Sequence, residues 1–431
     1  MSKKKVAYIS SPSYVALCNQ HPKTKNRAVV VDSLIEAYNL LNEVFVVAPT
    51  PALREDLMLF HSEDYVNCLE KIQNNLECEI VDYDKDEDSC EETFDLDELE
   101  EEFQISDYGF GYDCPVFKGL FDYAKMVVGA TVRAADILIK GEADFTINLH
   151  GGWHHAHVDE AAGFCYVNDI VIGILKLTSK FKRVLYVDLD VHHGDGVEEA
   201  FQYSKNVLTF SLHKHLNGYF PGTGAKQDIG KGSGKYFSVN VPLKDGIDDI
   251  MYYFVFNKLF NQIVLSFEPD VFVVQCGADS LSLDPLGGFN LTSQGIIDCV
   301  KDICACNKPV MILGGGGYNL ANTSRCWTQL TAMVVGKEIS RDIPDHDYME
   351  HYGPDFSVFV ASSNRKNENT DAYIEDLLEH VTTNITKIKM KKENSSKTID
   401  NKENETLKCA TERDFVADKL VKKQALMEKN C

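Results

Sequence analysis

The feature that most constrains the fold of this chain is the alternation of short, β-branched apolar runs with longer amphipathic stretches. The predicted strands are residues 6–9, 145–149, 184–190, 207–212, 271–275 and 309–313. Stretches with helical periodicity lie between them at 121–140, 169–180, 249–268 and 293–306. Strands separated by helix-length connections predict an α/β fold, a parallel sheet with helices on both faces.

The composition of the 431 residues is typical of a soluble globular protein, with 44% hydrophobic and 25% charged residues. Its strictly apolar runs are far shorter than the ~18 residues of a membrane span, and the N-terminus does not read as a secretory signal. Thirteen cysteines without a CxxC pair, in a chain without an export signal, favour a reducing compartment, the cytosol or the nucleus.

The net charge of −23 is unevenly distributed. Residues 77–107 contain sixteen acids and one lysine, a balance of −15, whereas residues 387–431 carry twelve basic and eight acidic side chains. An acidic chain is a poor candidate for direct DNA binding, which depends on neutralising phosphates. The acidic segment is either a solvated surface loop or a surface that attracts a basic, lysine-rich substrate.

We expect one catalytic domain over residues 1–386, with the acidic segment 77–107 as an insert. After about residue 362 the composition shifts to Asn, Lys, Glu, Ser and Thr. One further helix is predicted at 371–388, and the polar tail 387–431 is predicted to be largely disordered.

The segments that follow four predicted strands are rich in Asp, His, Gly and Tyr. They are His-Gly-Gly-Trp-His-His at 150–155, Asp-Leu-Asp-Val-His-His-Gly-Asp-Gly at 188–196, Cys-Gly-Ala-Asp at 276–279 and Gly-Gly-Gly-Gly-Tyr-Asn at 314–319. In open parallel sheets, ligands bind beyond the carboxyl ends of the strands. One such segment is explained by turn chemistry, but four of them predict a common site.

Asp190, His192 and Asp279 are predicted to bind a metal ion. Asp190 and His192 are two residues apart, so their side chains point to the same side of an extended backbone. Two carboxylates and one imidazole with a vacant position suit catalytic zinc, and also iron or manganese. The alternative is that Asp190 and Asp279 cap helices that begin just after them.

The other polar side chains predict acid–base chemistry. Asp188 and Asp195 are available to accept imidazole N–H groups from the tandem His154 and His155, which would fix a tautomer and raise basicity. At least one of the two histidines would then act as a general base or acid for a water that the metal activates. An exposed histidine pair is the alternative.

Tyr318 follows four glycines, where the backbone can approach the site closely and the phenol can donate to an oxyanion. A metal, a histidine base and a phenol together predict hydrolysis of a carbonyl compound. Spacing alone leaves open which amide or ester is hydrolysed.

These segments resemble the signature blocks of the class I histone deacetylases. The matching blocks are 151–156, 186–196, 277–279 and 314–318, and the resemblance runs in order from about residue 6 to residue 356. It implies an arginase–deacetylase fold, with an eight-stranded parallel sheet between helical layers. It also implies zinc- or iron-dependent removal of acetyl or other acyl groups from lysine side chains of histones and other proteins.

The resemblance implies a role for each matching residue. Asp190, His192 and Asp279 match the metal ligands, His155 with Asp195 matches the general base and acid, His154 with Asp188 matches its electrostatic partner, and Tyr318 matches the phenol that polarises the carbonyl. Family members also bind a structural potassium ion near the positions of Asp188, Asp190, His192, Ser211 and Leu212.

The resemblance also implies the substrate-binding residues. Gly163, Phe164 and Phe220 match the tunnel around the lysine methylenes, Trp153 lies beneath it, Asp113 matches the rim carboxylate that binds the substrate backbone, and Leu286 occupies a rim position where related enzymes carry Met. Taken alone, Phe164 and Phe220 are typical of core aromatics.

The chain departs from the family where other members carry arginines that bind an inositol phosphate and a corepressor. The corresponding positions hold Pro285, Leu320, Ala321 and Asn322, which disfavours an obligate corepressor complex. The resemblance thus implies a chromatin regulator and transcriptional repressor in the nucleus and cytoplasm, with acetylated proteins as partners and no direct contact with nucleic acid or membranes.

Three other functions stay open. The first is an acetylpolyamine-type amidohydrolase on the same fold, and the second is an inactive acetyl-lysine binding or scaffold protein. The third, an arginase-like enzyme with two manganese ions, needs a second carboxylate two residues after Asp279, where this chain has Leu281.

Overall fold

The computed structural model describes residues 4–78, 100 and 104–402, with side chains described for 4–75, 100 and 104–389. Most of the acidic segment 77–107 therefore lies outside the described residues, as does the part of the polar tail beyond residue 402.

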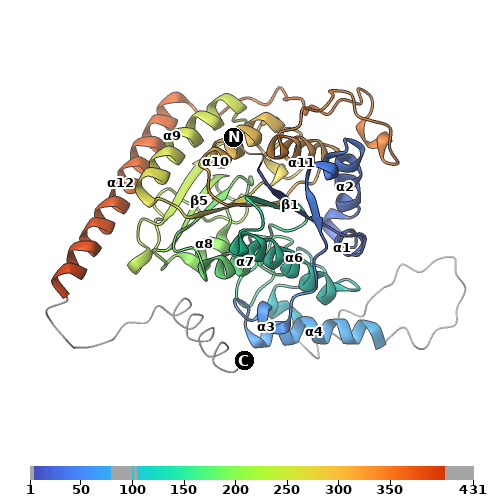
Figure 1. Ribbon diagram of the computed structural model, residues 1–431, viewed down its shortest axis with the longest axis horizontal. Coiled ribbons are helices and arrows are strands. Elements are labelled where there is room, and N and C mark those ends of the chain that lie inside the picture. The colour runs from blue at the N-terminus through green and yellow to red at the C-terminus, as the bar shows by residue number, and fades with distance from the viewer. Residues whose placement is uncertain (1–3, 79–99, 101–103, 403–431) are drawn as a thin grey trace, which may run out of the picture.

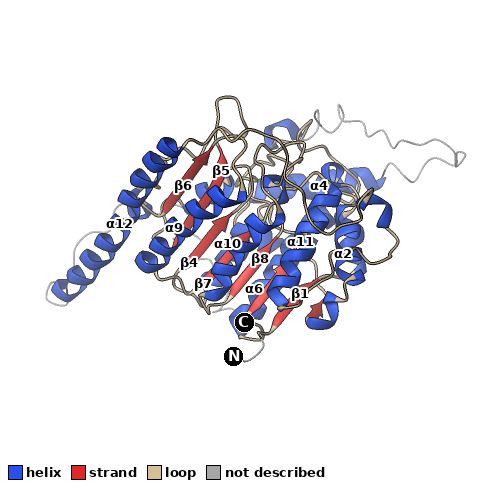
Figure 2. Cartoon of the chain, turned by 90° about the horizontal axis from the view of Figure 1, so that it is seen from above, coloured by secondary structure: helices blue, strands red, loops and turns tan. Residues whose placement is uncertain are grey.

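One parallel sheet forms the centre of the molecule, with the strand order β2-β1-β3-β8-β7-β4-β5-β6. Its strands are β1 (Val6–Ile9), β2 (Phe45–Val47), β3 (Phe145–Asn148), β4 (Val184–Asp188), β5 (Val207–Lys214), β6 (Ser238–Leu243), β7 (Val271–Gln275) and β8 (Val310–Leu313). Figure 2 shows these strands side by side from β6 to β1. The predicted α/β class and the eight-stranded parallel sheet are confirmed.

Helices cover both faces of the sheet. They are α1 (Pro12–Cys18), α2 (Arg27–Ala37), α3 (Arg54–Leu57), α4 (Glu63–Cys78), α6 (Leu120–Lys140), α7 (Asp169–Thr178), α8 (Asp195–Phe201), α9 (Asp249–Phe267), α10 (Ser293–Ala305), α11 (Leu320–Val335) and α12 (Asp371–Lys402). Figure 1 shows α9, α10 and α11 above the sheet and α6, α7 and α8 below it. Among the described residues, no helix combines the length and the apolar character that crossing a membrane requires.

Most of the strands are largely apolar because both of their faces are buried; the edge strand β2, whose Phe45 and Val46 are exposed, is the exception. In β1, Val6 and Tyr8 pack into one half of the core, and Ala7 and Ile9 pack into the other half. This alternation follows from the two-residue period of a strand. It explains why the strands read as continuous apolar runs in the sequence.

All six predicted strands are present. Their ends differ by a few residues, since β4 ends at Asp188 and β5 continues to Lys214. The predicted helix at 371–388 is longer than expected, because α12 continues to Lys402. The expectation of disorder from residue 387 is therefore wrong for 387–402.

Gly129 lies in the middle of α6, where the helix passes close to the loop before α3. A Cβ atom at this position would come within 1.9 Å of the carbonyl oxygen of Thr50 and 2.8 Å of the backbone nitrogen of Ala52. The same loop is tied to the helix by a hydrogen bond from Ala52 N to Lys125 O of 2.8 Å. A glycine is therefore required here for packing.

Gly129→Ala is expected to destabilise the protein by about 1–3 kcal/mol, the usual range for overpacking. On an open helix surface the same change would instead stabilise the helix by about 1 kcal/mol. Urea unfolding measures the difference. Asp136→Ala, on the partly exposed side of the same helix, serves as a control with an expected change within about 0.5 kcal/mol. A more stable Gly129→Ala protein would contradict the close approach.

Candidate functional site

Four neighbouring strands of the sheet carry the segments that the sequence singles out. The carboxyl ends of β3, β8, β7 and β4 are consecutive in the strand order. Because all four strands are parallel, the segments that follow them emerge at the same edge. The predicted common site is therefore formed.

Asp190, His192 and Asp279 lie together at this edge. All three are buried, and one ligand atom from each lies within 4.8 Å of the others. His192 Nδ1 is 3.1 Å from Oδ2 of Asp279 and 3.2 Å from Oδ1 of Asp190. The helix-cap alternative is wrong for both acids, since α8 begins after Gly194 and Asp279 lies within the short 3-10 turn Ala278–Ser280.

Backbone and amide donors hold the two carboxylates. Asp190 Oδ2 accepts hydrogen bonds from Gln275 Nε2 at 2.8 Å and from Gly316 N at 3.0 Å. Asp279 Oδ1 accepts a hydrogen bond from Val191 N at 3.1 Å. Each carboxylate therefore keeps an oxygen directed at His192.

The electrostatics of this group suit a divalent cation. Burial and the neighbouring charge of Asp190 raise the pKa of Asp279 to about 7. Burial would lower the pKa of His192, but Asp190 and Asp279 raise it to about 10. Both buried carboxylates therefore interact with the same imidazole. Two acids and one histidine form a donor set that binds zinc or a similar ion.

His154 and His155 are buried, at 3% and 4% exposure, so the exposed-pair alternative is wrong. Nδ1 of His154 lies 2.9 Å from Oδ2 of Asp188, and Nδ1 of His155 lies 2.7 Å from Oδ1 of Asp195. Both predicted histidine–carboxylate pairs are present in the structure.

The two histidines differ in their charge. Burial favours the neutral form of both rings. At His154 the carboxylates of Asp188 and Asp190 outweigh burial and raise the pKa to about 9. At His155 burial and the charge of His154 outweigh Asp195 and lower the pKa to about 4. At neutral pH His154 is therefore charged and His155 is neutral.

Tyr318 lies beside the metal-capable group. Burial, Asp279 and Asp190 all raise the pKa of its phenol, which therefore keeps its proton. Its backbone N–H donates to Oδ2 of Asp284 at 2.8 Å. The phenol is thus a protonated hydrogen-bond donor.

The predicted substrate-binding aromatics surround the same side chains. The ring of Phe220 lies 4.8 Å from that of His155, and the ring of Phe164 lies 5.5 Å from that of Tyr318. A Cβ atom on Gly163 would come within 2.5 Å of the His155 ring. Phe220 is 40% exposed and Phe164 is only partly buried, so neither is a core aromatic.

The remaining predicted positions range from the floor of the site to the surface. Trp153 is buried and donates from Nε1 to the carbonyl of His150 at 3.2 Å. Asp113 is exposed, and Leu286 is 41% exposed. In the register of β4 and β5, Asp188 pairs with Ser211. Leu212 follows Ser211 and is buried.

Two residues that the sequence reasoning missed also contribute. Tyr219 stacks on His192 with ring centroids 5.3 Å apart, and its hydroxyl lies 3.2 Å from Nε2 of His192. Asp169 accepts hydrogen bonds from the backbone nitrogens of Gly152 and Trp153. Neither residue follows one of the predicted strands that lead into the site. A search of the segments after those strands could therefore not find them.

Gly316 packs directly against the two candidate metal-binding acids. A Cβ atom there would come within 2.0 Å of Asp279 Oδ2 and 3.0 Å of Asp190 Oδ2. Gly316→Ala is therefore expected to weaken metal binding by at least about tenfold, as changes around metal ligands do, although every ligand is retained. Competition with a chelator measures the affinity.

Gly336→Ala is the matched control. Gly336 ends α11 with a φ of 70°, and a Cβ atom there would meet nothing within 4 Å. The change strains the backbone but leaves the acids in place. Equal metal affinities for the two variants would show that Gly316 does not shape the site.

Comparisons with known proteins agree with this geometry. Residues 21–334 match the family model described as histone deacetylase domain. The chain is 47% identical over 375 residues to "Histone deacetylase 8" of Xenopus tropicalis, covering 87% of this chain and 96% of the relative. It is 45% identical over 382 residues to "Histone deacetylase 8" of Danio rerio, covering 89% and 95%.

A more distant relative is "Histone deacetylase 1" of Homo sapiens, at 41% identity over 365 residues, 85% of this chain and 71% of the relative. Segments 11–15, 111–115 and 317–323 resemble histone deacetylase 8 within class I. The higher identities with the proteins of that name agree with this resemblance.

Proposed function

This chain belongs to the histone deacetylase family, within class I, and we propose that the side chains gathered beyond β3, β8, β7 and β4 remove acetyl groups from lysine side chains. One observation carries the proposal. A neutral, carboxylate-backed His155 and a protonated Tyr318 lie beside a buried group that suits a divalent metal. These are the parts that metal-assisted amide hydrolysis needs.

Asp190, His192 and Asp279 are the residues that would hold the ion, which we propose to be zinc, with Fe²⁺ as the alternative. When bound, such an ion supplies Lewis-acid polarisation to the amide carbonyl and to the attacking water. A second ion, a structural potassium, is proposed near Asp188, Asp190, His192, Ser211 and Leu212, bound partly through backbone carbonyls.

His155 is the proposed general base and acid. Its Nδ1 faces Asp195 at 2.7 Å, so the proton stays on Nδ1 and Nε2 is free to accept one from the attacking water. The same nitrogen then donates that proton to the departing lysine amine. The charged His154 remains fixed on Asp188 as an electrostatic partner.

Tyr318 is the proposed oxyanion donor. Its phenol keeps its proton in the site, so it can donate to the carbonyl oxygen as negative charge develops there. It makes this contact best in the tetrahedral state, which is what accelerates the reaction.

Tyr318→Phe is expected to lower kcat roughly 10²–10³-fold, the usual cost of losing one oxyanion donor. The KM for an acetyl-lysine peptide should change little, because the phenyl ring still packs on Phe164. Steady-state kinetics measures both constants. Undiminished turnover would remove Tyr318 from this role.

Asp190→Asn is expected to abolish stoichiometric metal binding, because the substitution removes one of two anionic ligands. Elemental analysis of the purified variant measures the metal content. Asp228→Asn, a change of the same kind at an exposed position outside the metal-capable group, should retain the ion. A full complement of metal in Asp190→Asn would contradict the ligand assignment.

The proposed substrates are acetylated lysines of proteins, including histones. Gly163, Phe164 and Phe220 would enclose the lysine methylenes, with Trp153 below them. At the rim, Asp113 would bind the peptide backbone and Leu286 would contact the flanking residues. We propose no direct contact with nucleic acid or membranes, and no obligate corepressor or inositol phosphate.

We further propose that residues 1–386 form the catalytic domain, with 77–107 as an acidic insert and 387–431 as a polar tail. The proposed locations are the nucleus and the cytoplasm.

The substrate class is tested by mass spectrometry, with an acetyl-lysine peptide and acetylspermidine offered together. We expect loss of acetate from the peptide, abolished by a chelator. Turnover of acetylspermidine alone would assign the chain to small-molecule amidohydrolases. No turnover of either substrate, with metal bound to the protein, would favour an acetyl-lysine binding protein.

A further inference from the structure

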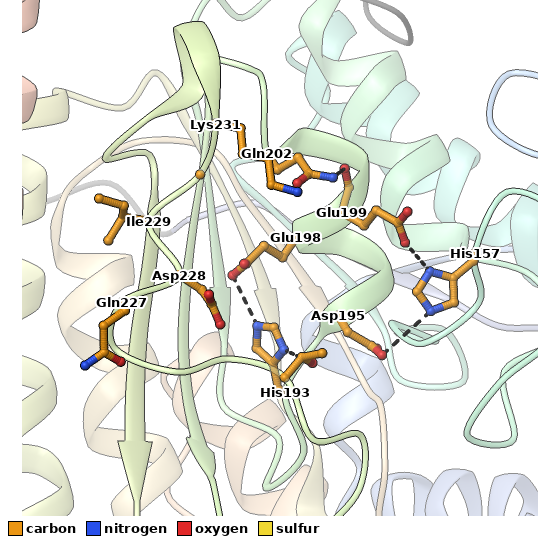
Figure 3. Close-up of a pocket in the computed structure, with 12 residues that line it drawn as sticks. His157, His193, Asp195, Glu198, Glu199, Gln202, Gln227, Asp228, Ile229 and Lys231 are labelled. Atoms are coloured by element: carbon orange, nitrogen blue, oxygen red, sulfur yellow. Dashed lines mark hydrogen bonds and ion pairs between the residues drawn. The ribbon is translucent and has the colours of Figure 1, made fainter.

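Asp195 is in contact with two histidines. Its Oδ1 lies 2.7 Å from Nδ1 of His155, and its Oδ2 lies 3.7 Å from Nε2 of His157. The other ring nitrogen of His157 lies 2.5 Å from Oε2 of Glu199, one turn further along α8. Figure 3 shows His157 between these two carboxylates, on the side of Asp195 that borders a pocket.

The backbone places His157 in this position. Its own N–H donates to the carbonyl of Glu160 at 2.8 Å. The carbonyl of Ala156, the residue before it, accepts a hydrogen bond of 2.9 Å from Nδ2 of the buried Asn168. Both imidazoles therefore reach the same carboxylate from one short segment.

His157 is protonated in this setting. Its contacts with Asp195 and then with Glu199 raise its pKa to about 10, against the opposing effect of partial burial. Burial would raise the pKa of Asp195, but His155 and His157 hold it well below its usual range. Asp195 therefore stays charged while it contacts both rings.

The other ionisable groups around these side chains come from several elements. His154 and His192 act on His155, His61 and Asp159 lie near His157, and Lys231 lies near Glu199; His193, Glu198 and Asp228 line the same pocket. Within this set His157 is the group that bridges Asp195 and Glu199.

We propose that His157 is a positioning residue of the deacetylation reaction, which binds Oδ2 of Asp195 and so keeps Oδ1 directed at Nδ1 of His155. The proposal rests on the roles assigned above to His155 and Asp195. A pocket of about 480 Å³ borders Asp195 on this side. Without His157, water from this pocket would solvate Oδ2, and the carboxylate would be held through Oδ1, by His155 and by the backbone N–H of Gly196 at 3.0 Å.

A fixed carboxylate matters because it fixes the imidazole. When Oδ1 accepts the Nδ1 proton of His155, the Nε2 lone pair is available to the substrate side. A carboxylate that turns away weakens this orientation, and small misplacements of reacting groups have large effects on rate. The role concerns turnover and not substrate binding, since no atom of His157 needs to touch the substrate.

Stability is not expected to depend strongly on this contact. The side chains of His157 and Glu199 are 26% and 59% exposed, and ion pairs with that much solvent contact contribute little to folding. A loss of activity in folded variants therefore reports positioning.

The test compares kcat and KM of the metal-loaded enzyme for an acetyl-lysine peptide in a set of variants. His157→Gln removes the charge and is expected to lower kcat about tenfold, with KM unchanged. His157→Lys keeps a cation near Asp195 and is expected to restore part of the loss. Glu199→Gln, which removes only the outer partner, should give a smaller loss. His351→Gln, at an exposed position, is the control.

The same His157→Gln change is also made in an enzyme that already carries Asp195→Asn. If His157 acts through Asp195, adding His157→Gln to Asp195→Asn causes no further loss, so the two effects are not additive. An equal fractional loss in both backgrounds would overturn the proposal. The proposal would also be overturned if the His157→Gln enzyme kept the full wild-type kcat while Asp195→Asn lowered it. Full turnover in Asp195→Asn itself would instead overturn the roles assigned to Asp195 and His155.

Discussion

The buried carboxylate of Asp190 is the contact on which the rest of the site depends. It accepts hydrogen bonds from Gln275 at the end of β7, from Gly316 beyond β8 and from the backbone of His192 beyond β4. One side chain thus joins three neighbouring strand ends. These bonds compensate for part of the cost of burying a charge. The negative charge that remains is available to a cation, so the same contact that aligns the strand ends also prepares the metal site.

Once this edge is formed, environment alone separates residues of one type into different roles. His154 and His155 are adjacent and both buried, yet one has a pKa of about 9 and the other of about 4. The difference arises because His154 faces two carboxylates, while His155 faces one and also feels the charge of His154. Paired titratable groups whose pKa values are pushed apart are characteristic of acid–base sites. A sequence shows only two histidines in tandem.

The parts of the molecule that follow local patterns were predictable, and the parts that depend on tertiary packing were not. Six strands were readable because both of their faces are buried. The two strands that the sequence analysis missed, β2 and β6, are the outermost strands of the sheet, and β6 contains Pro242. The strand order was also not readable, although the convergence of strand ends was. The same limit applied in the site, where Tyr219 and Asp169 arrive from outside the strand ends.

The surroundings of His155 explain why its carboxylate partner needs support of its own. On one side lie aromatic rings and the metal-capable group. Solvent screens charges weakly there, so each charge–charge interaction is strong. On the other side Asp195 borders a pocket lined by polar and charged side chains. A base between two such environments has a fixed orientation only if the carboxylate behind it does not exchange its contacts for water. His157, anchored by Glu199, occupies the position from which that exchange would begin. The proposed acid–base pair is therefore better described as a chain of four side chains, Glu199, His157, Asp195 and His155, than as a histidine with one partner.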